Sequence, residues 1–433
     1  MGEASSRDPA GPAVIVDPYS SGALFAPAFR EAGVPVVAVV SAPEPPAVYA
    51  SSYRPGDFDE TIVFDGDLER VVARLSELAP RCVLAGCESG VELADAVAPR
   101  VVPDVANVAS LASARRHKGD MAAAVEAAGL PIIRQICTAD PAAASAWIER
   151  EGLAGRDLVV KPPKSASTDG VTLLRGGRGW RECFDAQLGR PNRLGIVNER
   201  LLVQEYASGV EYVVDTFSHA GVHTVTDVCR YRKIDNGPHM AVYETMEWLP
   251  PEHGADDVVA YAKRVLDAVG IRYGAAHVEV MRTPAGPRLV EVAARAHGGG
   301  QPRFCRVATG DSQVDRTVRY FTGSGEIPAG YRLVKHVLVV FLIARAEGVV
   351  QNAEIFDAVP RLASHHFSTI ALRNGQRVQI TKDLFASLDL GFVVLAHEDR
   401  AQTVADCAAI RALERALIVD AAGRAGAEAA VPA

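Results

Sequence analysis

The sequence predicts an α/β protein of several domains, and three observations lead to this class. Short runs rich in Val and Ile alternate with amphipathic segments over the first hundred residues. Two strand-like runs flank a short turn within 277–295, and a series of short strand-like runs begins near residue 331. A chain of 433 residues is also too long for one hydrophobic core, so we expect about two to four domains.

The first hundred residues predict a parallel sheet. Strand-like runs (13–17, 34–40, 61–65 and 81–86) are separated by helix-like segments such as LERVVARLSELAP at 68–80. This alternation is typical of βαβ units. The turn DPYSSG after the first run lacks the GxGxxG spacing of a dinucleotide fingerprint, so a nicotinamide-dependent reductase is the least favoured function.

The remaining elements follow in order along the chain. A helix is expected over 110–131, because Gly129 and Pro131 are stop signals. Further helices are expected near 141–152 and 255–269, with strands at 201–206, 274–282 and 288–295. The segment from 331 is β-rich and ends in an alanine-rich helix, and we expect the tail 423–433 to be disordered.

Composition and charge exclude several classes of protein. The chain is 48% hydrophobic and 23% charged, as in ordinary globular proteins, and its net charge of −8 gives no basic excess for nucleic acid. Seven scattered cysteines without CxxC spacing favour a reduced, cytoplasmic setting. The N-terminus has no apolar signal segment, and its Met-Gly-x-x-x-Ser pattern (Gly2, Ser6) is too short to carry weight. The longest apolar run, 337–344, is too short to span a bilayer.

The strongest chemical signal is the stretch HVEVMRTPAGPRLVEVAARAHGGG at 277–300. If its two runs form a hairpin centred on Ala285, Glu279 lies opposite Glu291 on one face, together with His277 and Arg295. The alternate valines (278, 280, 290 and 292) then face a core. Two opposed carboxylates repel each other, so a divalent cation such as Mg²⁺ is an economical partner. The alternative is that both glutamates face water and Arg295 pairs with one of them.

Three other stretches favour a phosphate and nucleotide site. LVVKPPKSASTDGVTLL at 158–174 has Lys161 at a strand end, followed by a loop of small hydroxyl residues that can wrap phosphate oxygens. Lys118 stands about forty residues earlier in the expected helix. In LLVQEYASGVEYVVDTF at 201–217, a strand edge after Gln204 can recognise adenine, and Glu211 can accept from ribose hydroxyls. Each of these stretches also has a purely structural interpretation, namely a solvated lysine, an ordinary turn or a charged residue at a turn.

Taken in order, these residues resemble the ATP-grasp superfamily over about 10–325, and within it most closely the L-amino-acid ligases, which are dipeptide synthetases. The resemblance implies an ATP-grasp fold with an N-terminal Rossmann-like domain (1–109), a small lid subdomain (110–206), a large subdomain with the metal site (207–330) and a β-rich C-terminal subdomain (331–433).

The resemblance also implies roles for individual residues. For ATP these are the phosphate lysines, the flap, the adenine hinge and the ribose acceptor: Lys118, Lys161, Ser165, Ser167, Thr168, Gly170, Gln204, Glu205, Tyr206 and Glu211. Glu279 and Glu291 would bind Mg²⁺, with Mn²⁺ as an alternative, and Arg295 would stabilise the oxyanion of the tetrahedral intermediate. Glu88 and His277 match positions that hold the amino-acid substrate, and His277 would orient or deprotonate the amine, with a structural histidine as the alternative. Beside Arg295, the glycines 298–300 (Gly298, Gly299 and Gly300) leave backbone N–H groups open to hold a substrate carboxylate.

Two positions depart from the pattern of the superfamily. Many ATP-grasp enzymes have Asn two residues after the second metal-binding carboxylate, whereas this chain has Ala293. One magnesium ion would then be bound more loosely or through water. The first phosphate lysine commonly follows Asp, whereas here it follows His117, which leaves the role of Lys118 less defined.

We therefore expect an ATP-dependent carboxylate–amine ligase that forms an amide through an acyl phosphate and releases ADP and phosphate. The alternatives are a carboxylase-like enzyme that activates bicarbonate and a catalytically inactive nucleotide-binding protein. The expected partners are small amino acids or related acids, with no nucleic acid and no membrane, and a homodimer is left open. The sequence does not identify the two substrates.

Overall fold

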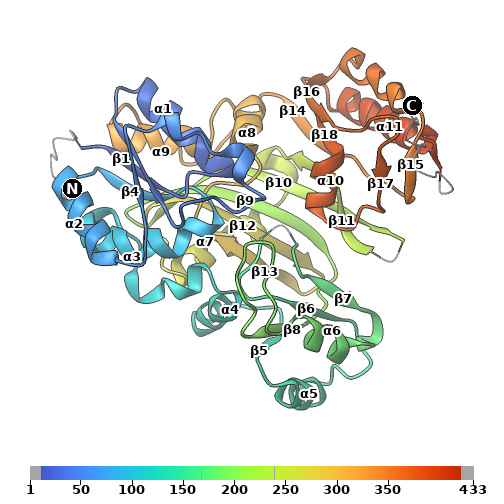
Figure 1. Ribbon diagram of the computed structural model, residues 1–433, viewed down its shortest axis with the longest axis horizontal. Coiled ribbons are helices and arrows are strands. Elements are labelled where there is room, and N and C mark those ends of the chain that lie inside the picture. Colours follow the sequence, from blue (N-terminus) through green and yellow to red (C-terminus); the bar gives the residue numbers. More distant parts are fainter. Residues whose placement is uncertain (1–10, 167, 238, 421–433) are drawn as a thin grey trace, which may run out of the picture. The chain divides into compact units, whose positions relative to one another are not determined.

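The computed structural model describes residues 11–166, 168–237 and 239–420 (Figure 1). It divides into two compact units, the first made of the chain up to residue 229 with 249–332, and the second of 230–248 with the chain from 333 onward. The predicted mixed α/β fold is confirmed. Gly2, Ser6, Ser167 and the tail 423–433 lie outside the described residues. No helix in the described ranges is both long and apolar enough to cross a membrane.

The first unit opens with the predicted parallel sheet, in the strand order β3-β2-β1-β4. Its elements are β1 (Ala13–Val16), α1 (Phe25–Glu31), β2 (Val36–Val40), β3 (Glu60–Val63), α2 (Leu68–Leu78), β4 (Cys82–Ala85) and α3 (Val91–Val101). Alternate residues of β1 point to opposite faces, so Val14 and Val16 pack with α2 and α3 while Ala13 and Ile15 pack with α1. Parallel sheets covered on both faces read as continuous apolar strands, as here.

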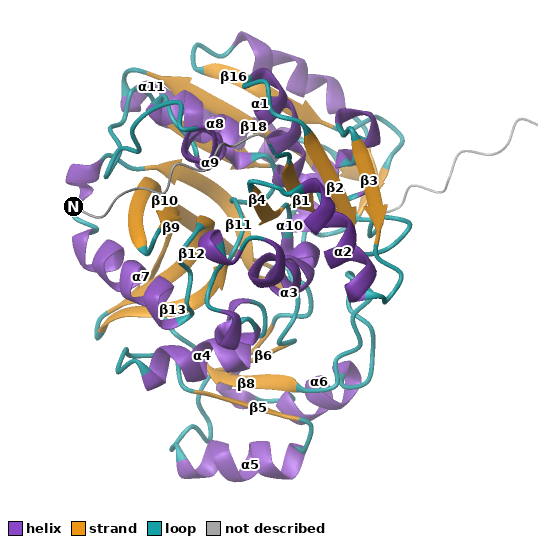
Figure 2. Cartoon of the chain, turned by 90° about the vertical axis from the view of Figure 1, so that its left-hand side faces the viewer, coloured by secondary structure: helices purple, strands orange, loops and turns teal. Residues whose placement is uncertain are grey.

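A second sheet in the first unit is antiparallel, in the order β5-β8-β6-β7. Its elements are β5 (Gln135–Thr138), α5 (Pro141–Arg150), β6 (Leu158–Lys161), β7 (Thr172–Leu174), α6 (Trp180–Gln187) and β8 (Leu201–Glu205). The hydroxyl-rich loop at 162–171 therefore joins two adjacent strands, β6 and β7. Figure 2 shows this sheet with α5 and α6 beside it.

The helix that leads into this sheet is shorter than predicted. Instead of a helix over 110–131, two 3-10 turns (Ala109–Leu111 and Ser113–Arg115) precede α4 (Lys118–Ala127). The His117 ring accepts a hydrogen bond from the backbone N–H of Asp120 at 3.2 Å and caps the helix. Lys118 is therefore the first residue of α4, and the capped end of the helix fixes the position of its backbone.

The third sheet of the first unit carries the predicted hairpin. Its strands follow the order β13-β12-β9-β10, with β9 (Val210–His219), β10 (Val222–Asn236, which continues into the second unit), β12 (Gly274–Thr283) and β13 (Gly286–Ala293). The helices are α7 (Asp256–Ala268), α8 (Gln301–Thr309) and α9 (Gln313–Thr322). The apolar face of α7, including Val258, Val265 and Leu266, packs on Val278 and Val292 of the hairpin.

The hairpin confirms the predicted pairing but not every side-chain direction. Glu279 lies opposite Glu291, and a bulge follows between Glu279 and Val280, so that Val280 pairs with Leu289. A bulge shifts one strand by one residue relative to its partner. Leu289 is therefore buried in the core, whereas Val290, predicted to face it, is only half-buried.

The second unit contains the expected β-rich segment. Its strands are β11 (His239–Trp248), β14 (His336–Phe341), β15 (Gly348–Val350), β16 (His365–Ile370), β17 (Arg377–Val378), β18 (Gly391–His397) and β19 (Val419–Asp420), with helices α10 (Leu384–Leu390) and α11 (Arg400–Ala416). Four strands lie in the order β11-β14-β18-β16, and three more form the sheet β17-β15-β19. The alanine-rich α11 packs its Ile410 against Val340 and Val393.

Candidate active site

The two opposed carboxylates of the hairpin are each balanced by a cationic or hydrogen-bonding neighbour. Lys118 donates to Glu291 Oε1 at 2.8 Å, and His277 Nε2 lies 3.2 Å from Glu279 Oε1. The side chains of Glu279 and Glu291 remain 17% and 20% exposed, so their outer oxygens can be reached. A pair of partly open carboxylates on one sheet face is a donor set of the hard-oxygen type that Mg²⁺ prefers, and the residues present fit this ion.

Lys161 lies at the end of β6 and is almost fully buried. Burial and the neighbouring Lys118 lower the pKa of its ammonium group to about 8, although Glu291, Glu279 and Glu211 act in the opposite direction. Two lysines and three glutamates thus share one region of the first unit. A buried ammonium group next to another one is poised to gain from an anion such as phosphate.

The predicted flap is tied to its surroundings at several points. The carbonyl of Ser165 accepts from Lys118 Nζ at 3.4 Å, and Lys164 pairs with Glu92 of α3 at 2.6 Å. Thr168 and Gly170 adopt positive φ angles of 64° and 73°, and a Cβ at Gly170 would lie 2.7 Å from the ring of Pro162. Glycine is therefore required at 170, whereas Thr168 is held in a conformation that L-residues disfavour.

The predicted adenine hinge lies at the end of an internal strand. Because β8 runs between β5 and β6, its backbone is paired up to Glu205, and even the Tyr206 N–H donates to the carbonyl of Asp157. The Glu205 carboxylate is held by Arg134 at 2.6 Å. A small cavity next to the hinge is lined by Lys118, Met121, Ala122, Ile132, Ile133, Gln135, Gln204, Leu289 and Val290. Lys118 and Gln204 thus share this apolar cavity, while Glu211, the predicted ribose acceptor, is buried at the start of β9.

A buried carboxylate, Asp215 of β9, joins two histidines beside the hairpin. It lies 2.8 Å from His277 Nδ1 and 2.7 Å from His297 Nδ1, and all three side chains are buried. Burial lowers the pKa of His277, but Asp215 and Glu279 raise it more, to about 9. For His297, burial outweighs Asp215 and lowers the pKa. Sequence reasoning missed Asp215 and His297; the available signal was a lone carboxylate within the otherwise apolar stretch VEYVVDTF.

Glu88 and Arg295, far apart in sequence, form a buried ion pair. Arg295 Nε donates to Glu88 Oε2 at 3.0 Å, and Arg116 Nη1 lies 3.2 Å from Glu88 Oε1. Burial alone would raise the pKa of Glu88. Arg116, Arg295 and Lys118 together have the larger, opposite effect and hold this pKa below its usual value, so the carboxylate is ionised. The sequence indicated Glu88 and Arg295 but not Arg116, which stands in a run of basic residues, ARRHK, that gave no separate signal.

The glycines after Arg295 contact a turn of the N-terminal sheet. Sequence reasoning left their N–H groups open for a substrate carboxylate. In the structure, Gly299 donates to Ser20 Oγ at 2.9 Å and Gly300 to Ser21 Oγ at 2.9 Å, and Ser21 donates in turn to the carbonyl of His297. The turn DPYSSG therefore binds the glycine loop, and two of the predicted substrate contacts already have protein partners.

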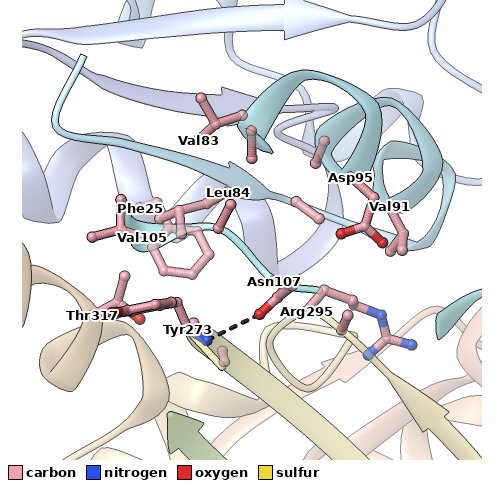
Figure 3. A pocket seen from close by; sticks show the side chains of 17 residues that line it. Phe25, Val83, Leu84, Val91, Asp95, Val105, Asn107, Tyr273, Arg295 and Thr317 are labelled. Atoms are coloured by element: carbon pink, nitrogen blue, oxygen red, sulfur yellow. Dashed lines mark hydrogen bonds between the residues drawn. The ribbon is translucent and has the colours of Figure 1, made fainter. Parts of the chain in front are cut away.

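A cavity of about 40 Å³ lies behind Arg295 (Figure 3). Residues of β4 and α3, such as Leu84 and Asp95, form one side, and Tyr273 forms the other, where its backbone N–H donates to Asn107 at 2.9 Å. Of the expected site residues, Arg295 lines this cavity, whereas Glu279 and Glu291 do not.

Comparisons with known proteins identify the family of this chain. A family model described as an ATP-grasp domain matches residues 155–302. Dapdiamide A synthase of Enterobacter agglomerans is 32% identical over 307 residues, which cover 70% of this chain and 71% of that protein.

Two solved structures share the fold over nearly the whole chain. The L-amino acid ligase from Bacillus licheniformis superposes with a TM-score of 0.71 at 16% identity, covering 96% of this chain and 100% of that one. Carboxyaminoimidazole ribonucleotide synthase from Aspergillus clavatus, complexed with ATP, gives 0.65 at 15% identity, with 94% and 99% covered. On the strength of the sequence match and the shared fold, this chain belongs to the ATP-grasp superfamily of ligases, close to the amino-acid ligases.

Proposed function

We propose that the protein is an ATP-dependent ligase that joins the carboxylate of an amino acid or related small acid to an amino-acid-like amine. The observation that carries this proposal is the opposed pair Glu279 and Glu291. Lys118 and Lys161 lie near these two carboxylates, and Arg295 follows Glu291 by four residues in the chain. Metal-binding carboxylates, phosphate-binding cations and a fixed guanidinium are the groups that acyl-phosphate chemistry requires.

The first step transfers the γ-phosphoryl group of ATP to the acid. An oxygen of the acid's carboxylate attacks the γ-phosphorus, the bond to the bridging oxygen breaks, and ADP leaves with the electron pair. Lys118 and Lys161 balance the charge of the phosphate oxygens, and the flap around Ser165, Thr168 and Gly170 excludes water from the acyl phosphate. Mg²⁺ held by Glu279 and Glu291 would neutralise phosphate charge, and Ala293 supplies no third ligand.

In the second step the amine attacks the acyl carbon and phosphate leaves. Arg295 is permanently charged and held by Glu88 at 3.0 Å, so its guanidinium can stabilise the oxyanion of the tetrahedral intermediate. A pKa of about 9 favours a charged His277 at neutral pH. Such an imidazolium orients substrates and Glu279 rather than removing a proton, so the amine itself must arrive with a neutral nitrogen.

The nucleotide would occupy the region between β8 and α4. The chain beyond Glu205 leaves the sheet, where its backbone groups can bind the edge of the adenine ring. Glu211 is the proposed acceptor for the ribose hydroxyls. The proposal includes the four domains inferred from the sequence, namely 1–109, 110–206, 207–330 and 331–433.

A coupled assay for phosphate release tests the proposal. Wild-type protein with ATP and Mg²⁺ is incubated with a matrix of amino acids and small acids, each alone and in pairs. We expect phosphate and ADP to appear at a substantial rate only when an acid and an amine are both present, with an amide product seen by mass spectrometry. Phosphate release that depends on bicarbonate instead would show a carboxylase-like enzyme, and none with any pair would show an inactive nucleotide-binding protein.

A further inference from the structure

A single buried carboxylate serves two guanidinium groups next to the proposed metal site. Glu88 begins a short 3-10 turn (Glu88–Gly90) and is 2% exposed. It contacts Arg295 through one oxygen and Arg116 through the other. Two positive groups therefore share one negative group, which leaves one net positive charge in a region of low dielectric constant. A buried uncompensated charge is costly, so an anion bound there would be stabilised.

Arg116 makes fewer hydrogen bonds than its neighbour Arg115. Arg115 Nε binds Asp95 at 2.8 Å, and its Nη1 binds the carbonyl of Val269 at 2.9 Å, so it links segments of the fold. Only its Nη2 makes no hydrogen bond, whereas both terminal nitrogens of Arg116 are shielded from solvent and make none in the described part of the chain, although Nη1 lies 3.2 Å from Glu88 Oε1. Buried donors of this kind are rarely left unpaired in folded proteins.

The position of Arg116 points to a ligand of the ligase site. It stands two residues before Lys118, which binds Glu291, and its partner Glu88 binds Arg295. The Tyr49 side chain lies within electrostatic range of Arg116, Arg295 and Glu88. The N–H groups of Gly299 and Gly300, the other candidate anion site, already donate to Ser20 and Ser21. Arg116, by contrast, has two buried nitrogens that make no hydrogen bond within the described residues.

We propose that Arg116 binds a substrate carboxylate, and that Glu88 is a positioning residue that fixes both Arg116 and Arg295. The inference rests on the proposed function and adds a residue to it. A guanidinium offers two parallel N–H groups that match the two oxygens of a carboxylate. The carboxylate could belong to the acid that is activated or to an amino acid that supplies the amine, and the two sources differ in which Michaelis constant depends on Arg116.

The test compares Arg116→Lys with the matched control Arg115→Lys. Phosphate release is measured at saturating ATP while the acid and the amine are varied in turn. We expect Arg116→Lys to raise the KM of one of them by about tenfold to a hundredfold, as loss of a charged hydrogen bond does, with the KM of ATP unchanged. Arg115→Lys should lower the melting temperature and leave every KM unchanged.

Two further arms identify the source of the carboxylate. If the KM of the amine rises, the corresponding amino-acid amide, which has no carboxylate, should react equally well with wild type and variant. If the KM of the acid rises instead, the carboxylate is that of the acid. Both results support the proposal. A change confined to the KM of ATP, or unchanged constants throughout, would overturn it.

A binding measurement separates this inference from the ligase assignment. Wild type, Arg116→Lys and Arg116→Gln are titrated calorimetrically with the proteinogenic L-amino acids in the presence of a non-hydrolysable ATP analogue, and folding is checked by circular dichroism. Weaker binding to the folded variants supports the role of Arg116 even if no turnover is found, which would sink only the ligase function. Equal binding, or no binding to wild type, overturns the proposal.

Discussion

Replacing Glu291 with Gln separates the proposed metal-binding role of this carboxylate from its role in the fold. In the structure Glu291 lies opposite Glu279 and accepts from Lys118 at 2.8 Å. Removing one partner of a buried ion pair costs about 3–5 kcal/mol when the other charge is left uncompensated. Here the Gln oxygen can still accept from Lys118, the carboxylate is 20% exposed, and the repulsion from Glu279 disappears. We therefore expect a loss in the free energy of unfolding below about 2 kcal/mol.

The effect on catalysis should be far larger. A metal ion contributes several kcal/mol of charge stabilisation to the transition state, and about 3 kcal/mol corresponds to roughly a hundredfold in rate. Gln is a neutral ligand and binds Mg²⁺ more weakly than a carboxylate. Turnover of Glu291→Gln should thus fall at least about a hundredfold at ordinary magnesium and recover in part at high magnesium.

The assay measures phosphate release across a magnesium titration, together with the melting temperature. Glu126→Gln is the control, because Glu126 lies exposed on α4, the helix that carries Lys118. It should match wild type in both measurements. Near-normal turnover of Glu291→Gln at ordinary magnesium would refute the metal assignment, and a large loss of stability would refute the reasoning about Lys118.

Three more predictions follow from the structure. Arg295→Met should lower kcat about a hundredfold or more with ATP affinity nearly unchanged, and lost ATP binding with normal turnover at saturation would show that Arg295 is a nucleotide or structural residue. Because the pKa of Lys161 is about 8, ATP should bind about tenfold more weakly at pH 9 than at pH 7, a trend that calorimetry should find missing in Lys161→Gln. Burial and Asp215 raise the pKa of Asp227 to about 7, so the folded state holds a proton that the unfolded state has lost between about pH 4 and 7. The free energy of unfolding of wild type, relative to that of Asp227→Asn, should therefore fall as pH rises through this window. Denaturation experiments at several pH values measure both, and a constant difference between the two proteins would contradict the prediction.

Local patterns were sufficient to predict much of the fold and part of the site. The alternation of apolar runs and helices predicted the parallel sheet, and period-two alternation with a short turn predicted that Glu279 faces Glu291. The sequence could not predict that Leu289, rather than Val290, faces the core. This change follows from a bulge, which depends on how the strands twist and pack rather than on the local pattern.

The parts that sequence reasoning missed depend on contacts between distant segments. Arg116 meets Glu88, and Asp215 meets His297, only after three sheets have packed together. The start of α4 was also predicted too early, because the apolar pattern of 110–117 suits 3-10 turns as well as a helix. The Ser20 and Ser21 hydroxyls occupy the glycine N–H groups for the same reason, since 279 residues separate each pair.

An isotope experiment tests the acyl-phosphate mechanism most directly. Once a reactive pair is known, the acid is prepared with ¹⁸O in its carboxylate and incubated with ATP, Mg²⁺ and the amine, and the phosphate and nucleotide products are analysed by mass spectrometry. If the carboxylate attacks the γ-phosphorus, one labelled oxygen is left on inorganic phosphate after the amine displaces it, and the nucleotide product is unlabelled ADP. Unlabelled phosphate, or label found in AMP, would contradict the mechanism proposed for this site.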